Sequence, residues 1–332
     1  MKKFIVFLTI TMLTASLFGA SAFDIKWGDQ TTYSRLPGNT LRAWAEGVEG
    51  SIGTGKKFYV DSGVATGGDS SGTSWTNAVT TIDAGVGLCT ASRGDVIYVA
   101  PGHAETVASA TGLVCDIAGI SIIGIGNGSM IPTISLGTAV TAKVSVTAAN
   151  VRLSNLKIIS ALADVAEGID PTADADGLVV DNCIFTDGSV SLELKIAINV
   201  TADCDNIRLI NNRFSTVAAG GCTNAIVLAG GSDNSVISGN VAYGTYSAGA
   251  LLASAALSVN LTITDNIFVT TAEVAAVTLK ADTTGVYARN FAGSTTTILL
   301  TVINDDAMYC WENYDTGAPG ASGVINPAID SD

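Results

Sequence analysis

Residues 206–214 read NIRLINNRF and residues 261–269 read LTITDNIFV. In both stretches aliphatic residues alternate with polar ones, a central Asn follows, and a Phe stands two residues later. The same phrase occurs seven times, and its Asn recurs at steps of 27, 30, 28, 26, 24 and 23 residues. Steps of this size indicate a solenoid, because one such unit cannot bury its apolar face alone. The shared residues are Asn155, Asn182, Asn212, Asn240, Asn266, Asn290 and Asn313.

The spacing around each Asn favours strands over helices. Ile207 and Leu209 are two residues apart, as are Leu261 and Ile263, whereas a helix would space them by three or four. Asn tolerates the left-handed conformation of a sharp bend, and its amide can bond to the same residue in the next turn. We therefore predict a ladder of stacked Asn along one corner of a parallel β-helix, with no chemical role. Its register is open by one residue, since Asn211 could replace Asn212.

Two earlier segments extend the pattern. Residues 93–107 read RGDVIYVAPGHAETV and residues 119–136 read GISIIGIGNGSMIPTISL. Together with the Asn-marked repeats, they resemble the first turns of the pectin-lyase-like superfamily over about Lys57 to Asp315. The resemblance implies an all-β, single-stranded, right-handed parallel β-helix whose first turn is capped by a helix. It is a poor guide to function, because this fold carries lyases, hydrolases, esterases, adhesins and phage appendages.

The N-terminus indicates export. Lys2 and Lys3 precede an apolar run, and Ala20-Ser21-Ala22 ends it, which is typical of a signal peptide. The mature protein is then secreted or extracellular, at the cell surface or in the periplasm. A helical run is expected over residues 77–89. The predicted divisions are a signal peptide at 1–22, an N-terminal arm at 23–57, a parallel β-helix at 58–316 (cap 58–94, turns 95–316) and a tail at 317–332.

The charge balance limits the partners. The chain carries a net charge of −14, and signal removal takes away two Lys and leaves −16. Nucleic acids and anionic membranes require Lys and Arg patches, so neither is an expected partner. No membrane insertion is expected after signal cleavage, since no second apolar run is long enough to span a bilayer.

Six cysteines in an exported chain allow disulfides. Cys89 with Cys115, and Cys204 with Cys222, are the pairs to test. Cys183 directly follows a corner Asn and is expected to be a buried apolar residue. The absence of a CxxC motif argues against zinc.

Catalytic signals are weak. The single histidine, His103, stands in PGHAET, where a turn residue is expected, and Asn304-Asp305-Asp306 has no basic motif after it. Tyr243 aligns with the inward Phe positions and is expected in the core.

A calcium site is the strongest chemical candidate. Its weak ligand candidates are Asp174, Asp176 and Asp181, with Arg152 or Arg208 as a base on a neighbouring turn. A solvated turn is favoured over this metal site. No cofactor is expected unless calcium binds there.

The sequence thus favours a non-enzymatic exported module. It would be structural or would bind a polysaccharide or a cell-surface protein. Self-association, as a trimer or end to end, and a place in a virion or appendage are compatible with it. The alternative is a secreted calcium-dependent, pectate-like polysaccharide lyase.

Overall fold

The computed structural model describes residues 55–64, 68–217, 222–294, 301–303, 308–316 and 323–324. The chain divides into two units, Met1–Thr54 and Gly55–Asp332, and the described residues belong to the second. The predicted signal peptide, nearly all of the predicted arm, Asn304-Asp305-Asp306 and most of the predicted tail lie outside the described residues. The divisions proposed for those segments stay predictions.

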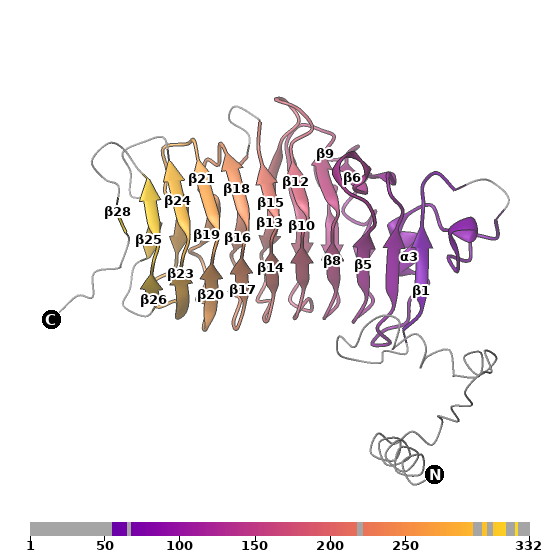
Figure 1. Cartoon of the computed structure of the whole chain (residues 1–332), viewed down its shortest axis with the longest axis horizontal. Helices are drawn as coiled ribbons and strands as arrows, with labels where there is room; N and C mark the ends of the chain where they lie inside the picture. The colour runs from indigo at the N-terminus through magenta and orange to yellow at the C-terminus, as the bar shows by residue number, and fades with distance from the viewer. Residues whose placement is uncertain are drawn as a thin grey trace, which may run out of the picture. The chain divides into compact units, whose positions relative to one another are not determined.

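The described unit is a parallel β-solenoid, which confirms the predicted all-β class (Figure 1). Its strands form three sheets of ten, ten and eight strands, named here sheets A, B and C. Sheet A contains β1 (Lys57–Val60), β2 (Val96–Val99), β5 (Ser121–Gly124), β8 (Arg152–Ser154), β11 (Val179–Asp181), β14 (Arg208–Ile210), β17 (Val236–Ser238), β20 (Leu261–Thr264), β23 (Gly285–Ala288) and β26 (Met308–Trp311). Sheet B contains β3 (Ala104–Val107), β6 (Thr133–Leu136), β9 (Lys157–Ser160), β12 (Ile184–Thr186), β15 (Arg213–Ser215), β18 (Val241–Gly244), β21 (Ile267–Thr270), β24 (Phe291–Ser294), β27 (Tyr314–Thr316) and β28 (Gly323–Val324). Sheet C contains β4 (Val114–Cys115), β7 (Val144–Val146), β10 (Val165–Pro171), β13 (Leu194–Val200), β16 (Asn224–Leu228), β19 (Leu251–Ala253), β22 (Val277–Leu279) and β25 (Thr301–Ile303).

Each turn of the solenoid passes through sheets A, B and C in that order. Strand β11 pairs with β8 before it and β14 after it, and Val180 lies between Leu153 and Leu209 in register. The same residue position therefore recurs on every turn and forms a column along the solenoid. All of these pairings are parallel except the last, in which β28 runs antiparallel to β27.

The corner between sheets A and B contains the predicted Asn ladder. The Nδ2 group of Asn240 donates to Oδ1 of Asn266 at 3.0 Å, and that of Asn266 donates to Asn290 at 2.9 Å. The ladder runs from Asn212 to Asn313, and its five Asn are almost fully buried. Each Asn Oδ1 also accepts the backbone N–H at the equivalent position of the preceding turn.

Asn155 and Asn182 do not belong to this ladder, and their predicted register is off by one residue. They have φ angles of +53° and +55°, the left-handed conformation that Asn211 also adopts at φ +55°. The ladder position on their turns is taken by the next residue, Cys183 in the case of Asn182, whose backbone N–H donates to Asn212. The left-handed corner position and the ladder position are therefore adjacent residues with different tasks.

The core lies between the three sheets and is built from columns of inward side chains. Phe185 and Phe214 stack with ring centroids 4.9 Å apart. The next inward residue in this column is Ala242, followed by Phe268, so a small residue separates two rings. Cys183 is buried as predicted.

The helical run expected at residues 77–89 is much shorter in the structure. A 3-10 turn, η2 (Trp75–Asn77), precedes a five-residue helix, α3 (Ile82–Val86). Thr81 caps α3 by accepting the N–H of Ala84, and Ile82 and Val86 are buried in the core. A second 3-10 turn, η3 (Gly128–Met130), precedes β6. Among the described residues, no helix has the length and apolar character to span a bilayer.

Candidate functional site

Asp181, at the end of β11, is engaged in a cross-strand ion pair. Its carboxylate accepts two hydrogen bonds from the guanidinium of Arg152, from Nε at 2.8 Å and from a second nitrogen at 2.9 Å. It accepts a third from Oγ of Ser154 at 2.9 Å. Burial by itself raises the pKa of Asp181, but the hydrogen bonds from Arg152 and Ser154 outweigh it and leave this pKa lowered. The carboxylate thus joins neighbouring strands of sheet A.

Asp176 lies in the exposed turn before β11 and takes part in a second ladder. Its Oδ1 accepts the N–H of Asp205 at 2.8 Å, and Asp205 in turn accepts the N–H of Asp233 at 2.8 Å. Asp174, two residues earlier, is exposed. Within the described part of the chain, no three His, Cys, Asp or Glu residues gather as metal ligands would. The three predicted ligand candidates therefore do not converge here.

His103 ends the turn at Pro101-Gly102, where its N–H donates to the carbonyl of Ala100 at 3.1 Å, and its side chain is buried. Its Nδ1 accepts the N–H of Ser62 at 2.9 Å, and its Nε2 lies 3.3 Å from Oε2 of Glu105. The same Glu105 oxygen accepts the N–H of Ile82 at the start of α3. His103 and Glu105 thus connect β3, the Ser62 loop and α3.

A charged group on sheet C was not found from the sequence. Lys143 Nζ lies 2.8 Å from Oε2 of Glu167 and 2.5 Å from Oδ2 of Asp170, and Asn199 donates to Glu167 at 2.7 Å. Partial burial lowers the pKa of Lys143, but its bonds to Asp170 and Glu167 outweigh this and leave the pKa raised. A base for proton abstraction must be neutral at the working pH, so this Lys is poorly suited to that role. The sequence did contain a sign of this contact, because Lys143 and Asp170 are 27 residues apart, which is about one turn of the solenoid.

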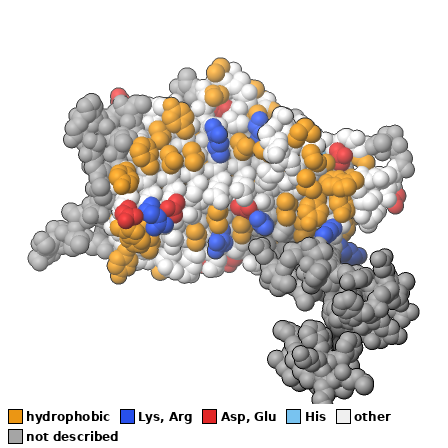
Figure 2. Space-filling view, in the orientation of Figure 1, with side chains coloured by type: hydrophobic (Ala, Val, Ile, Leu, Met, Phe, Trp, Pro, Cys, Tyr) orange, Lys and Arg blue, Asp and Glu red, His pale blue; other side chains and the backbone are white. Residues whose placement is uncertain are grey.

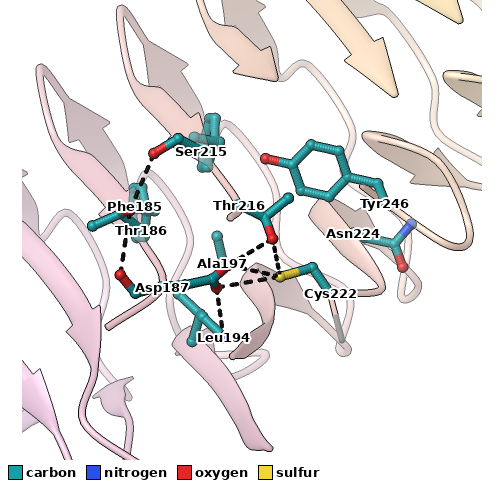
Figure 3. A pocket seen from close by; sticks show the side chains of 11 residues that line it. Phe185, Thr186, Asp187, Leu194, Ala197, Ser215, Thr216, Cys222, Asn224 and Tyr246 are labelled. Carbon is teal, nitrogen blue, oxygen red and sulfur yellow. Dashed lines mark hydrogen bonds between the residues drawn. The ribbon is translucent and has the colours of Figure 1, made fainter. Parts of the chain in front are cut away.

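A small cavity lined by both apolar and polar side chains lies between sheets B and C (Figure 3). Oδ2 of Asp187 accepts a hydrogen bond from Oγ1 of Thr216 at 2.6 Å. The thiol of Cys222 lies 2.8 Å from the same hydroxyl. The ring of Tyr246 lies across the cavity. Its volume of about 10 Å³ suffices for one water molecule at most.

The thiols of the core are protonated. Burial raises the pKa of Cys222 to about 12, with Asp187 adding to the shift, and Cys115, Cys183 and Cys204 also reach about 12. A thiol, unlike a thiolate, is a poor nucleophile. All six cysteines are free in the structure, so neither of the two proposed disulfides is formed.

The outer face of sheet B carries several exposed hydrophobic side chains. Val241 is 38% exposed, Ile267 43% and Tyr243 61%, so the prediction that Tyr243 lies in the core was wrong. Figure 2 shows hydrophobic side chains over the strands that Figure 1 labels β18, β21 and β24. The outward positions of strands β3 to β24 contain no Asp or Glu, and their charged residues are Lys157 and Arg213. In a chain with 30 acidic residues, the outward positions of these strands bring no carboxylate and combine aliphatic and aromatic side chains with Thr, Ser, Lys157 and Arg213.

No protein-family model matches the chain, and no curated protein matches its sequence.

Proposed function

We propose that this protein is an exported, non-enzymatic module that acts through contact surfaces, as a structural element or as a binder of surface polysaccharide or protein. Its scaffold is a right-handed parallel β-helix of the pectin-lyase-like type, with α3 as part of the N-terminal cap. It works without a cofactor. The observation that carries this proposal is the carboxylate-free outer face of sheet B with its exposed Val241, Tyr243 and Ile267.

The arrangement of the charged residues supports the proposal. Asp181 pairs with Arg152, Asp176 binds the backbone of the next turn, and Lys143 is held between two carboxylates. These contacts connect neighbouring turns and stabilise the stack. An exposed apolar patch of several hundred Å² usually marks an interaction site.

Two measurements test the proposal. The first incubates the purified chain with polygalacturonate and with alginate, with and without calcium, and follows the absorbance of unsaturated products. We expect no product from the chain or from the Asp174→Ala/Asp176→Ala variant. Calcium-dependent product that the variant abolishes would establish the lyase alternative instead.

The second measurement tests contact directly. The immobilised chain is exposed to soluble copies of itself, and the soluble chain is mixed with insoluble cellulose and chitin. The proposal requires saturable binding in at least one of these experiments. A chain that binds none of these probes would contradict it.

A further inference from the structure

Seven consecutive outward side chains on sheet B, from Lys157 to Tyr314, form one continuous column, which Thr133 and Ala104 extend toward the N-terminus. In register, Ile184 lies between Lys157 and Arg213, Val241 lies between Arg213 and Ile267, and Phe291 lies between Ile267 and Tyr314. We infer that this column is the contact surface for a second copy of the chain. The two copies pack face to face with their solenoid axes antiparallel, about a two-fold axis along β18.

Charge favours this face for self-association. With a net charge of −14, two copies repel each other over most of their surfaces. Sheet A presents Asp181, and sheet C presents Glu167 and Asp170, although each of these is paired. On sheet B, no outward position of strands β3 to β24 is an Asp or a Glu. Two copies that pack through this sheet therefore bring no outward carboxylates together.

The order of residues in the column is complementary to itself. Val241 is the middle residue of the stretch from Lys157 to Tyr314, so a two-fold axis along β18 places it against its own copy and leaves Thr133 and Ala104 outside the paired strands. The same axis places Arg213 over Ile267, Ile184 over Phe291 and Lys157 over Tyr314. The aliphatic stem of Arg can cover Ile, and a Lys ammonium over a Tyr ring is a cation–π contact worth about 0.5–1 kcal/mol at an exposed site.

The neighbouring column fits the same axis. In it, Tyr243 lies between Ser215 and Val269, so Tyr243 also meets its own copy and forms an aromatic pair. On either side, Thr186 lies opposite Gly293, where the missing side chain leaves room. The contact is isologous, as two-fold contacts between identical chains must be.

The size of the face sets the strength of the dimer. Seven strands that lie about 4.8 Å apart and are each about 10–13 Å long give a flat area of roughly 300–400 Å² per copy. Flanking turns add to this, but a standard stable interface buries about 800 Å² per partner. We therefore expect a reversible dimer with a dissociation constant in the micromolar range rather than an obligate one.

Sedimentation velocity of the purified chain, from low to high micromolar concentration, tests the inference. We expect a monomer–dimer equilibrium in the parent chain. Val241→Glu places two carboxylates against each other and should raise the dissociation constant at least tenfold, as should Val241→Lys. An equimolar mixture of the two variants should recover dimer. Val236→Glu, an outward position on sheet A, is the matched control and should dimerise like the parent.

A second measurement does not depend on charged variants. Val241→Cys places two thiols beside the two-fold axis, and mild oxidation should produce a reducible covalent dimer, whereas Val236→Cys should not. A monomeric parent chain, an unchanged dissociation constant in Val241→Glu, or equal crosslinking of the two Cys variants would overturn the inference. The inference rests on the proposed contact role, but its failure is distinguishable, since a monomer that binds cellulose or chitin still meets the broader proposal.

Discussion

Asn266 satisfies four hydrogen-bonding groups in the buried corner. Its Oδ1 accepts the N–H and the Nδ2 of Asn240, and its own Nδ2 donates to the carbonyl of Ile237 and to Asn290. The Asn266→Ala substitution removes these hydrogen bonds. The N–H of Asn240 and the carbonyl of Ile237 then stay buried and lose the side chain to which each was bonded. We expect a loss of about 2–4 kcal/mol in the free energy of unfolding, measured by urea denaturation.

The control for this substitution is an Asn outside the ladder. Asn127 precedes η3, is exposed, and makes no capping hydrogen bond with its side chain. Asn127→Ala should change stability by less than about 0.5 kcal/mol. Equal effects of the two substitutions would contradict a structural role for the ladder.

Asp181 should make stability depend on pH. Its folded pKa is lowered, although burial opposes this, because Arg152 and Ser154 bind the charged form. A lowered folded pKa gives stability that is complete above the unfolded pKa of about 3.9 and is lost as the pH falls through the folded pKa. Asp181→Asn should therefore cost about 1–2 kcal/mol at pH 7. The difference from the parent should shrink below about pH 4.

Thermal melts at a series of pH values check this prediction. Asp174→Asn is the control, because Asp174 is exposed in the turn before β11. It should follow the parent within about 0.5 kcal/mol over the same range. A constant difference between Asp181→Asn and the parent from neutral to strongly acidic pH would contradict the assignment.

At the scale of the element, the corner can accept one more ladder residue. The thiol of Cys183 lies at the ladder position, 3.6 Å from the carbonyl of Leu153, and its N–H already donates to Asn212. In Cys183→Asn, the new Nδ2 could donate to Leu153 and Asn212, as Nδ2 of Asn212 does to Val180 and Asn240. We expect this variant to keep the parent's stability or to gain up to about 1 kcal/mol.

The matched variant is Cys204→Asn. Cys204 is also fully buried but lies outside the ladder, so a new amide there should cost about 1–3 kcal/mol. Urea denaturation of both variants compares them. Similar losses in the two would mean that the ladder cannot be extended and that Cys183 serves only as packing.

The comparison of turns explains what the sequence could predict. Alternating side chains and a recurring Asn suffice for a parallel β-solenoid, because both are local signals. The exact ladder position is not local, since the left-handed residue before it is Asn211 on one turn, Gly239 on the next and Asp265 after that. When the next residue is Leu156 or Cys183 instead of Asn, the left-handed Asn is easily mistaken for the ladder residue.

Tyr243 shows the same limit in the core. Phe214 and Phe268 stand two residues after their ladder Asn, and Ala242 holds that inward position after Asn240, so the alternation of the strand turns Tyr243 outward. The prediction aligned Tyr243 one residue out of register. The exposed hydrophobic side chains of sheet B, which depend on this register, were therefore not predicted.

At the scale of the whole molecule, charge is distributed unevenly, and this governs the expected response to salt. Two copies joined through sheet B keep their acidic surfaces apart, yet the net charge of −14 on each still opposes their approach. Raising the ionic strength shortens the Debye length, which is about 10 Å at 0.1 M, and screens this repulsion. Apolar contacts are not weakened by that screening.

We therefore expect salt to strengthen the dimer. Sedimentation velocity should show the dissociation constant falling several-fold between roughly 0.02 M and 0.3 M sodium chloride, over which the Debye length drops from about 20 Å to less than 10 Å. Val241→Glu should gain more than the parent, because salt also screens the added repulsion between its two facing carboxylates. A dimer that dissociates as salt is added would mean that ion pairs hold it together. Its interface would then lie among the charged residues of sheets A and C, where carboxylates are present, and not on sheet B.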